Sequence, residues 1–552
     1  MKVIVLGIDG ATWDLLRPWS DEGGLPNLTR VLEGGVHGKL RSTIPPYSAQ
    51  AWVSMMTGKS PAKHGVVDFF EQDAARKRRG YASSTLIDGE AIWDTLGRHP
   101  KRVGMFNLPL TCPPLPVNGY MVSGFMTPKG RDDYTYPREL REEILGVTGE
   151  YDPDPWDPLT PSEDLGSFVH WLDIAEHAAR YLEEKHSTDF FISVIQVLDQ
   201  LQHLFWDALA SKEARKEPQM RKAWPLIASC YETMDEAIGH RLDLLDENTT
   251  MFLVSDHGFQ AVNTWFNANR WLAEQGFLRF SEDQVGWTKS TLARIGLTRE
   301  NIKAFIRRVD RLGLRRHVGR LTRATISRKL GETLALPIDW SQTVAYSGTR
   351  TNEGIYINVK GREPHGIVEP GTEYEEVRAR VMEKLAALVD PNTGQPVVSA
   401  VYRREDVNAG EHLELMPDIS FSLDGKPYLV SDSTTTTHVF DPIPKDYVQG
   451  RHHSQGLFAA FGPHIVAGRE IRDANIVDIV PTVLYAMNLP VPTDVDGHVL
   501  EDAFTEQYRK AHPIRYEEPV AGGAKGAPPT IEYTDEEEEA MQRRLKGLGY
   551  VS

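Results

Sequence analysis

The sequence predicts an α/β fold in which a mostly parallel central sheet is flanked by helices on both faces. Three observations predict this class. Strand-like runs recur that are short, continuous and apolar, as expected of strands covered on both faces. Stretches with helical periodicity lie between them. Acidic residues and histidines stand where several of these runs end, and ligand sites of such sheets gather at the carboxyl ends of the strands.

Five apolar runs are expected to form strands of the sheet. Their short length is typical of buried strands rather than of buried helices. They are residues 2–9 (KVIVLGID), 102–110 (RVGMFNLPL), 190–199 (FFISVIQVLD), 250–256 (TMFLVSD) and 457–462 (LFAAFG). Residues 168–184 and 221–245 are amphipathic and are expected to form crossover helices.

The 552 residues are expected to form one discontinuous catalytic core with additions. The core is predicted over residues 1–280 and 336–505, with an irregular insertion near 128–165 that is rich in Pro, Asp and Gly. Residues 506–552 are predicted to form a linker and an acidic helical tail. Large α/β enzymes exceed the usual domain size of about 100–200 residues by accepting such insertions.

Residues 281–335 are predicted to form a basic helical cap. Within them, residues 289–332 carry thirteen Lys and Arg against three acids, in a chain whose net charge is −17. Two interpretations are open. The segment is either a solvated helical hairpin lying against the acidic body, or a cap that attracts a multiply charged phosphate substrate or an anionic headgroup.

Composition excludes several classes of protein. The net charge of −17 argues against general nucleic-acid binding. Two cysteines, Cys112 and Cys230, supply neither a disulfide framework nor a thiolate metal cluster. The apolar run before Asp9 is too short for a signal peptide, and no stretch approaches the roughly 20 apolar residues that span a bilayer. We therefore expect a soluble, cytoplasmic protein without a transmembrane segment.

Three carboxylates and three imidazoles stand at or beside the ends of the predicted strands. Carboxylate oxygen and imidazole nitrogen are ligands of hard-to-borderline divalent cations. Two such ions about 3.5–4 Å apart form the clamp of many phosphoryl-transfer enzymes. A doubly wound sheet would bring the following residues together: Asp9, Asp199, His203, Asp256, His257 and His452.

Two pairs within this set have informative spacing. Asp199 and His203, at i and i+4, share one face if a helical turn starts there. Asp256 and His257 are adjacent, and adjacent side chains of an extended segment point in opposite directions. They are therefore expected to approach the metal centre from two directions rather than to touch. Each piece alone has a structural alternative, since an Asp at a strand end is commonly a helix N-cap or turn former.

Ser48 is the candidate nucleophile. The stretch RSTIPPYSAQAWVSMMTGKSPAKHGV (41–66) contains a Pro-Pro turn, then Ser48, then an apolar helix-like run. Two interpretations stay open. Ser48 is either the cap of this helix, or its hydroxyl faces the metals, where the helix N-terminus favours a bound phosphate and a metal-bound alkoxide is an activated nucleophile.

The motifs resemble, in order, those of the alkaline phosphatase superfamily. They are GIDG, Ser48 with TGKSPAKHG, the D-x-x-x-H of DQLQH, SDHG, and H-x-x-x-G before FGP. The chain is most similar to the type I phosphodiesterase/nucleotide pyrophosphatase branch, in particular to proteins described as predicted phosphohydrolases or phosphomutases. The resemblance covers most of residues 1–500 and implies an alkaline-phosphatase-like core.

The resemblance implies a phosphohydrolase that cleaves phosphate esters of a phosphorylated small molecule, with phosphodiesterase activity favoured. It implies two divalent metal ions, expected to be zinc. Manganese is the alternative, because the phosphoglycerate mutase branch of the superfamily uses it. Ser48 would attack phosphorus in line to form a covalent intermediate, and a metal-activated water would release it. The implied ligands are Asp199, His203 and His452 for one metal, and Asp9, Asp256 and His257 with the bridging Ser48 for the other.

Departures from the branch keep alternatives open. Nucleotide pyrophosphatases carry Thr as nucleophile, whereas Ser48 is the residue type of phosphatases and mutases. They also place an Asn after the HG motif, where this chain has Asp68 and Phe69, and Asn107 is considered as a substitute substrate-binding residue. The residues after Ser48 lack the sulfatase pattern. The alternatives are a phosphomonoesterase or phosphomutase of the same superfamily, and an inactive metal-containing binding module.

Overall fold

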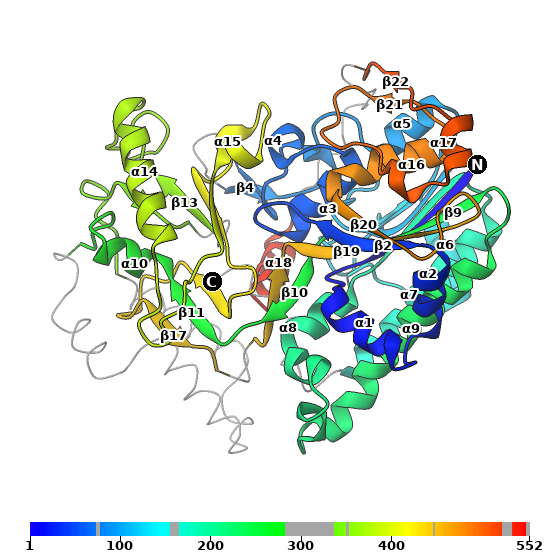
Figure 1. The fold of residues 1–552 in the computed structure, drawn as a ribbon, viewed down its shortest axis with the longest axis horizontal. Coiled ribbons are helices and arrows are strands. Elements are labelled where there is room, and N and C mark those ends of the chain that lie inside the picture. The colour runs from blue at the N-terminus through cyan, green and yellow to red at the C-terminus, as the bar shows by residue number, and fades with distance from the viewer. Residues whose placement is uncertain are drawn as a thin grey trace. The chain divides into compact units, whose positions relative to one another are not determined.

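The computed structural model describes residues 1–72, 78–154, 165–281, 336–348, 353–444, 448–520 and 533–547 (Figure 1). The chain divides into two compact units. Unit 1 comprises Met1–Val262, Arg404–Met416 and Pro444–Val551, and unit 2 comprises Asn263–Arg403 and Pro417–Ile443. None of the described helices combines the length and the hydropathy needed to span a bilayer.

Unit 1 is built on a nine-stranded sheet whose strand order is β20-β2-β19-β9-β1-β8-β5-β6-β7. Strand β1 lies at its centre and pairs in parallel with β8 and β9, and β5 continues the parallel pairing on β8. Strand β19 runs antiparallel to both β9 and β2. The strands are β1 (Lys2–Ile8), β2 (Val36–Arg41), β5 (Val103–Leu108), β6 (Gly119–Ser123), β7 (Thr135–Tyr136), β8 (Phe190–Ile195), β9 (Thr249–Val254), β19 (Gln455–Phe461) and β20 (Arg469–Asn475).

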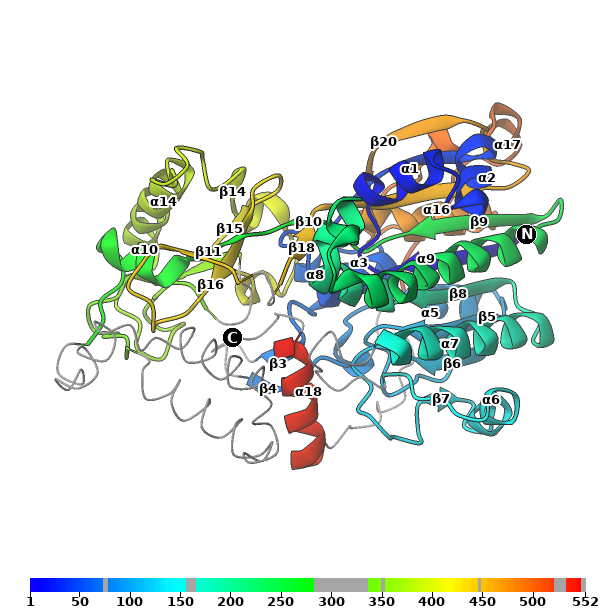
Figure 2. The ribbon, with the colours of Figure 1, turned by 90° about the horizontal axis from the view of Figure 1, so that it is seen from below.

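Helices cover both faces of this sheet, which confirms the predicted fold class. Alternate residues of β1 enter opposite cores, because successive strand side chains point to opposite faces: Val3 and Val5 belong to one hydrophobic cluster, Ile4 and Leu6 to the other. The first face is covered by α3 (Ser48–Thr57), α5 (Ile92–Arg98) and α16 (Ile479–Ala486), and the second by α1 (Trp13–Asp21), α2 (Pro26–Gly34), α7 (Leu165–Lys185) and α9 (Met220–Asp243). The long helices α7 and α9 run side by side (Figure 2).

Shorter elements complete unit 1. The segment predicted as an irregular insertion near 128–165 contains β7 and the helix α6, and its residues 155–164 lie outside the described part. The remaining elements are β3 (Phe70–Gln72), β4 (Arg78–Tyr81), β10 (Gly258–Ala261), β18 (Gly450–His453), β21 (Val491–Pro492), β22 (Tyr516–Glu517), α4 (Pro61–His64), α6 (Leu140–Thr148), α8 (Val197–Ala210), α15 (Arg404–Val407), α17 (Glu506–Ala511) and α18 (Asp535–Gly547).

The tail helix α18 packs against unit 1. Its side chains Met541 and Leu545 are buried in the same cluster as β1 and α3, and Arg544 forms a buried ion pair with Asp154 at 2.6 Å. Met541 and Leu545 are four residues apart, so they lie on one face of the helix, and this face meets the core.

Unit 2 has a hydrophobic cluster of its own, which includes Phe266, Trp271, Val381 and Phe421. Residues 263–280, 336–403 and 417–443, which the sequence assigned to the catalytic core, belong to this unit in the structure. Its elements are β11 (Thr264–Asn267), β12 (Ala345–Tyr346), β13 (Gly354–Ile357), β14 (Ala400–Arg403), β15 (Ile419–Ser422), β16 (Tyr428–Ser431), β17 (Phe440–Pro442), α10 (Ala268–Glu274) and α14 (Thr372–Ala386).

The predicted basic cap over residues 281–335 lies, apart from its first residue, outside the described residues.

Candidate metal centre and nucleophile

Three parallel strands deliver the acidic residues to one edge of the sheet. In the register of the sheet, Ile8 of β1 pairs with Ile195 of β8, and Gly7 pairs with Val254 of β9. The residues that follow these three strand ends therefore begin side by side, as parallel strands require. Asp9 follows β1, α8 carries Asp199 and His203 after β8, and Asp256 and His257 follow β9.

His452 reaches the same edge on a short strand that pairs with the segment following His257. Strand β10, directly after His257, pairs antiparallel with β18, and Phe259 is the partner of His452. The Phe259 ring contacts all three imidazoles, with centroid distances of 4.8 Å to His203, 5.8 Å to His257 and 5.3 Å to His452. An aromatic wall of this kind limits the orientations that the three rings can take.

The six predicted ligands form two buried groups in the structure. In one, Asp199 Oδ1 lies 3.2 Å from His452 Nε2 and 3.6 Å from His203 Nε2. In the other, His257 Nε2 lies 3.2 Å from Asp256 Oδ2 and 3.6 Å from Asp9 Oδ1. The candidate ligand atoms within each group are all within 4.8 Å of one another. The groups adjoin, because the His257 and His452 rings stack with centroids 3.5 Å apart.

The expectation that Asp256 and His257 do not touch is wrong. Their side chains meet at 3.2 Å between Asp256 Oδ2 and His257 Nε2. The rule of opposite directions holds for an extended strand, and β9 ends at Val254, so both residues lie in a bend beyond it. The bend turns both groups toward the same centre.

Backbone carbonyls fix the tautomer of all three imidazoles. Nδ1 of His203 lies 3.0 Å from the Gly450 carbonyl, Nδ1 of His452 lies 2.8 Å from the Pro46 carbonyl, and Nδ1 of His257 lies 3.1 Å from the carbonyl of the next residue. A carbonyl can only accept, so each Nδ1 carries the proton and donates it. The lone pair of each ring is thereby on Nε2, the atom that faces the carboxylates.

The carboxylates complement these lone pairs only if a cation is present. Asp9 Oδ1, Asp199 Oδ1 and Asp256 Oδ2 accept no hydrogen bond from the described residues, although all three are buried. Buried acceptors without donors are costly. Three carboxylate oxygens facing three nitrogen lone pairs form a set of ligand atoms that fits divalent cations.

The pKa values of the candidate ligands also favour a bound cation. Burial, followed by the charges of Asp256 and Asp199, raises the pKa of Asp9 well above its ordinary value. Burial also raises the pKa of Asp256 to about 7 and lowers the pKa of His203 to about 4. The charged forms of Asp9, Asp256 and His203 are therefore disfavoured in the bare site, whereas the neighbouring imidazoles lower the pKa of Asp199 to about 2 despite its burial. A bound cation would favour the ionised form of Asp9 and Asp256. Neutral imidazole is the form that binds a metal.

Ser48 stands against the second group. Helix α3 begins at Ser48, and its N-cap is Tyr47, which makes no side-chain capping hydrogen bond. Ser48 is therefore the first helical residue and not the cap. Its buried hydroxyl lies 3.0 Å from His257 Nε2. The Ser48 hydroxyl therefore lies beside the Nε2 lone pair of His257 and at the N-terminus of α3, where the helix dipole is positive.

Asn107 lies apart from this constellation. It stands in β5 with a φ of 58°, and its Nδ2 donates to the Val194 carbonyl at 3.0 Å. Its side chain makes no hydrogen bond to Ser48 or to the six ligands in the described part of the chain. A role of Asn107 in substrate binding stays a prediction.

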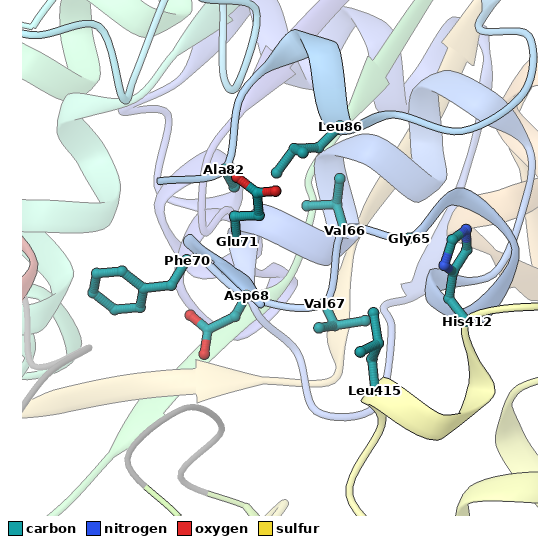
Figure 3. A pocket seen from close by; sticks show the side chains of 10 residues that line it. All are labelled: Gly65, Val66, Val67, Asp68, Phe70, Glu71, Ala82, Leu86, His412 and Leu415. Atoms are coloured by element: carbon teal, nitrogen blue, oxygen red, sulfur yellow. The ribbon is translucent and has the colours of Figure 1, made fainter. Parts of the chain in front are cut away.

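Asp68, after the HG motif, lines a cavity of about 140 Å³ (Figure 3). The figure shows its carboxylate directed away from that of Glu71, and His412 also lines the cavity. Pockets that bind drug-sized ligands measure about 300–1,000 Å³. This cavity is therefore large enough only for a few atoms of a ligand.

Sequence reasoning missed the residues that support the ligands. Trp52 Nε1 donates to Asp9 Oδ2 at 3.1 Å, and the Gly10 amide donates to Asp256 Oδ1 at 3.2 Å. The i, i+4 spacing of Ser48 and Trp52 was the one signal available for Trp52. The carbonyls that bind the imidazoles belong to backbone and leave no signal in residue type.

Comparison with known proteins assigns the chain to a family. The sequence profile of the type I phosphodiesterase / nucleotide pyrophosphatase family matches residues 3–455. No curated protein sequence matches the chain. Among solved structures, human ectonucleotide pyrophosphatase / phosphodiesterase 5 is 13% identical with a TM-score of 0.44. An inactive form of the murine protein in complex with AMP is 12% identical with a TM-score of 0.44. Both alignments cover 92% of this chain and 100% of that chain.

The family match confirms the branch that the ordered motifs predicted. It spans both ligand groups and Ser48, from the strand that precedes Asp9 to the residues just beyond His452. The chain belongs to the type I phosphodiesterase / nucleotide pyrophosphatase family and is a hydrolase that acts on phosphoric ester bonds.

Proposed function

We propose that the chain hydrolyses phosphodiesters of phosphorylated small molecules through a covalent intermediate on Ser48 at a two-metal site. One observation carries the proposal: the Ser48 hydroxyl lies 3.0 Å from His257 Nε2, a member of one of two adjoining buried ligand groups. A serine hydroxyl is a weak nucleophile unless its surroundings activate it. Placement beside a group that would hold a cation is such an activation.

The two ligand groups would hold one divalent cation each, zinc by preference and manganese as the alternative. Such cations supply positive charge that offsets the developing charge on the phosphoryl oxygens and lowers the pKa of a hydroxyl beside them. The donors would be Asp199, His203 and His452 for one ion, and Asp9, Asp256 and His257, with Ser48 beside them, for the other.

The chain itself supplies the nucleophile and its orientation. Ser48 Oγ forms a bond to phosphorus while the bond from phosphorus to the leaving oxygen breaks in line. The proton of the Ser48 hydroxyl ends on the leaving oxygen, so the products are an alcohol and a phosphodiester on Ser48. The first turn of α3, which begins at Ser48, would offer backbone amides as hydrogen-bond donors to the non-bridging oxygens. Attack of water on the same phosphorus then breaks its bond to Oγ and returns the proton to Ser48.

The test is to trap the intermediate, and α3 offers a matched control. Ser54 lies on the same helix, is also buried, and its hydroxyl lies 2.9 Å from His64 Nε2. We expect wild-type protein and Ser54→Ala, quenched in acid during turnover of bis(p-nitrophenyl) phosphate, to carry a nitrophenylphosphoryl group on the peptide that contains residue 48. Ser48→Ala should show neither adduct nor turnover above about 10⁻³ of wild type.

Substantial turnover by Ser48→Ala, or an adduct on another residue, would contradict the covalent mechanism. Assays of the wild-type protein with a panel of phosphate monoesters and diesters separate the related activities. Faster hydrolysis of p-nitrophenyl phosphate than of the diester would indicate a phosphomonoesterase. An isomerised phosphate ester without release of free phosphate would indicate a phosphomutase. A metal-loaded protein that is inert to every ester would indicate a binding module.

A further inference from the structure

The side chain of Trp52 joins the nucleophile helix to one of the candidate metal ligands. Trp52 is fully buried and lies one helical turn after Ser48 on α3, so both side chains project from the same face. Its Nε1 donates to Asp9 Oδ2 at 3.1 Å, across forty-three positions of sequence. No other described side chain donates to Asp9.

The indole also packs on β1, the strand that Asp9 follows. A Cβ atom added to Gly7 would lie 2.6 Å from Cη2 of Trp52, closer than real side chains approach. Asp9 lies two residues after Gly7, in the turn that directly follows the end of β1 at Ile8. The absence of a side chain at position 7 thus lets the ring lie against the strand while its N–H reaches Asp9.

These two contacts select which Asp9 oxygen faces the metal centre. The indole N–H is a donor only and occupies Oδ2. Oδ1, which accepts no hydrogen bond from the described residues, is left 3.6 Å from His257 Nε2. Because Ser48 lies 3.0 Å from the same nitrogen, the two residues of α3 set the ligand and the nucleophile against one imidazole.

We propose that Trp52 is a positioning residue, whose indole N–H orients Asp9 toward the second metal and fixes that ligand relative to Ser48. This rests on the proposed two-metal site. Hydrogen bonds to ligating carboxylates orient them, and loss of such a partner typically weakens metal binding or activity by about 10–100-fold. The coupling to α3 adds a second expectation: kcat falls more than KM changes, because nucleophile and ligand lose their common support.

A buried tryptophan elsewhere in the same core provides the control. Trp93 on α5 is also nearly fully buried, and its Nε1 has no hydrogen-bond partner among the described residues. Trp52→Phe and Trp93→Phe therefore remove similar volume, and only the first removes a hydrogen bond. Replacement of Trp52 by 3-benzothienylalanine, which keeps the two-ring shape without the N–H, isolates the hydrogen bond if the phenylalanine variant folds poorly.

The readout is zinc affinity measured by chelator competition, together with zinc content and steady-state kinetics. We expect both Trp52 replacements to weaken one of two sites by about 10–100-fold and to lower kcat, with Trp93→Phe unchanged. Asp9→Asn, measured in parallel, should weaken the same site. If Asp9→Asn loses zinc while both Trp52 replacements bind it like wild type, the positioning role is refuted and the two-metal site stands. If Asp9→Asn also binds two zinc ions normally, the proposed site itself fails.

Discussion

We predict that Asp256→Asn lowers the stability of the protein when zinc is bound but does not lower it when a chelator has removed the metal. Asp256 is fully buried; its Oδ1 accepts from the Gly10 amide at 3.2 Å, and its Oδ2 lies 3.2 Å from His257 Nε2. Asparagine has the same shape. Its oxygen can keep the Gly10 hydrogen bond, and its amide group can donate to the Nε2 lone pair. The fold is thus preserved, whereas an anionic ligand is lost.

The magnitude follows from the charges and from mass action. At a metal concentration 100 times its dissociation constant, each site stabilises the native state by about 2.7 kcal/mol. Asp256→Asn should forfeit about that much for the second site when zinc is present. In chelator the variant should be at least as stable as wild type, because one of three neighbouring buried carboxylates has been neutralised.

Thermal unfolding in zinc and in chelator measures both effects, and Asp235→Asn is the control. Asp235 is also buried, but it accepts from the Asn27 and Leu28 amides at 3.0 and 2.8 Å, and it lies in neither ligand group. Asp235→Asn should therefore destabilise the protein equally in zinc and in chelator. If Asp256→Asn also lowers the unfolding midpoint equally with and without zinc, Asp256 is a structural hydrogen-bonding residue and the metal assignment is refuted.

Two further predictions concern groups outside the metal centre. Burial, then the nearby His412, lowers the pKa of His64 from 6.5 to about 3, so its stabilising contribution is complete above pH 6.5 and is lost as the pH falls toward 3. Relative to His64→Gln, wild type should lose up to about 1.4 kcal/mol per pH unit across that window in urea unfolding; parallel pH profiles would contradict a neutral, buried His64. Leu545→Ala in α18 should lower the free energy of unfolding by about 2–5 kcal/mol, because Leu545 is fully buried in the core of unit 1. The control Leu226→Ala should change it little, because Leu226 is 36% exposed. Equal effects of the two substitutions would mean that α18 does not pack on this core in solution.

The central strands of the sheet were predictable because both of their faces are covered. β1, β5 and β8 lie within their predicted runs, and β9 begins one residue before its run. The run predicted over 190–199 was too long, because the chain turns into α8 at Val197. The edge strand β20 (REIRDAN) was not found, since four of its seven residues are exposed and their polarity hides the strand pattern. The antiparallel direction of β19 depends on connections that residue patterns do not encode.

Unit 2 was not distinguished from the core for a related reason. Its strands are short, at two to four residues, and its cluster joins segments that are far apart in sequence, such as Phe266 and Phe421. Short apolar runs of this kind predict buried residues but not which core they enter. The cytoplasmic location and the identity of the metals stay predictions.

The ligands were found in the sequence because their chemistry is visible in residue type and their places follow from the sheet. Their supporting contacts were hidden for two reasons. The acceptors of the imidazole protons, such as the carbonyls of Pro46 and Gly450, are backbone atoms. The contact of Asp256 with His257 depends on a bend, where the alternation of a strand no longer applies.

Anomalous diffraction from crystals grown with zinc tests the central claim most directly. We predict two peaks per chain, one bounded by Asp199, His203 and His452 and the other by Asp9, Asp256 and His257, with Ser48 Oγ beside the second. Peaks at other residues, or no peak at either group in a protein that hydrolyses diesters, would contradict the account.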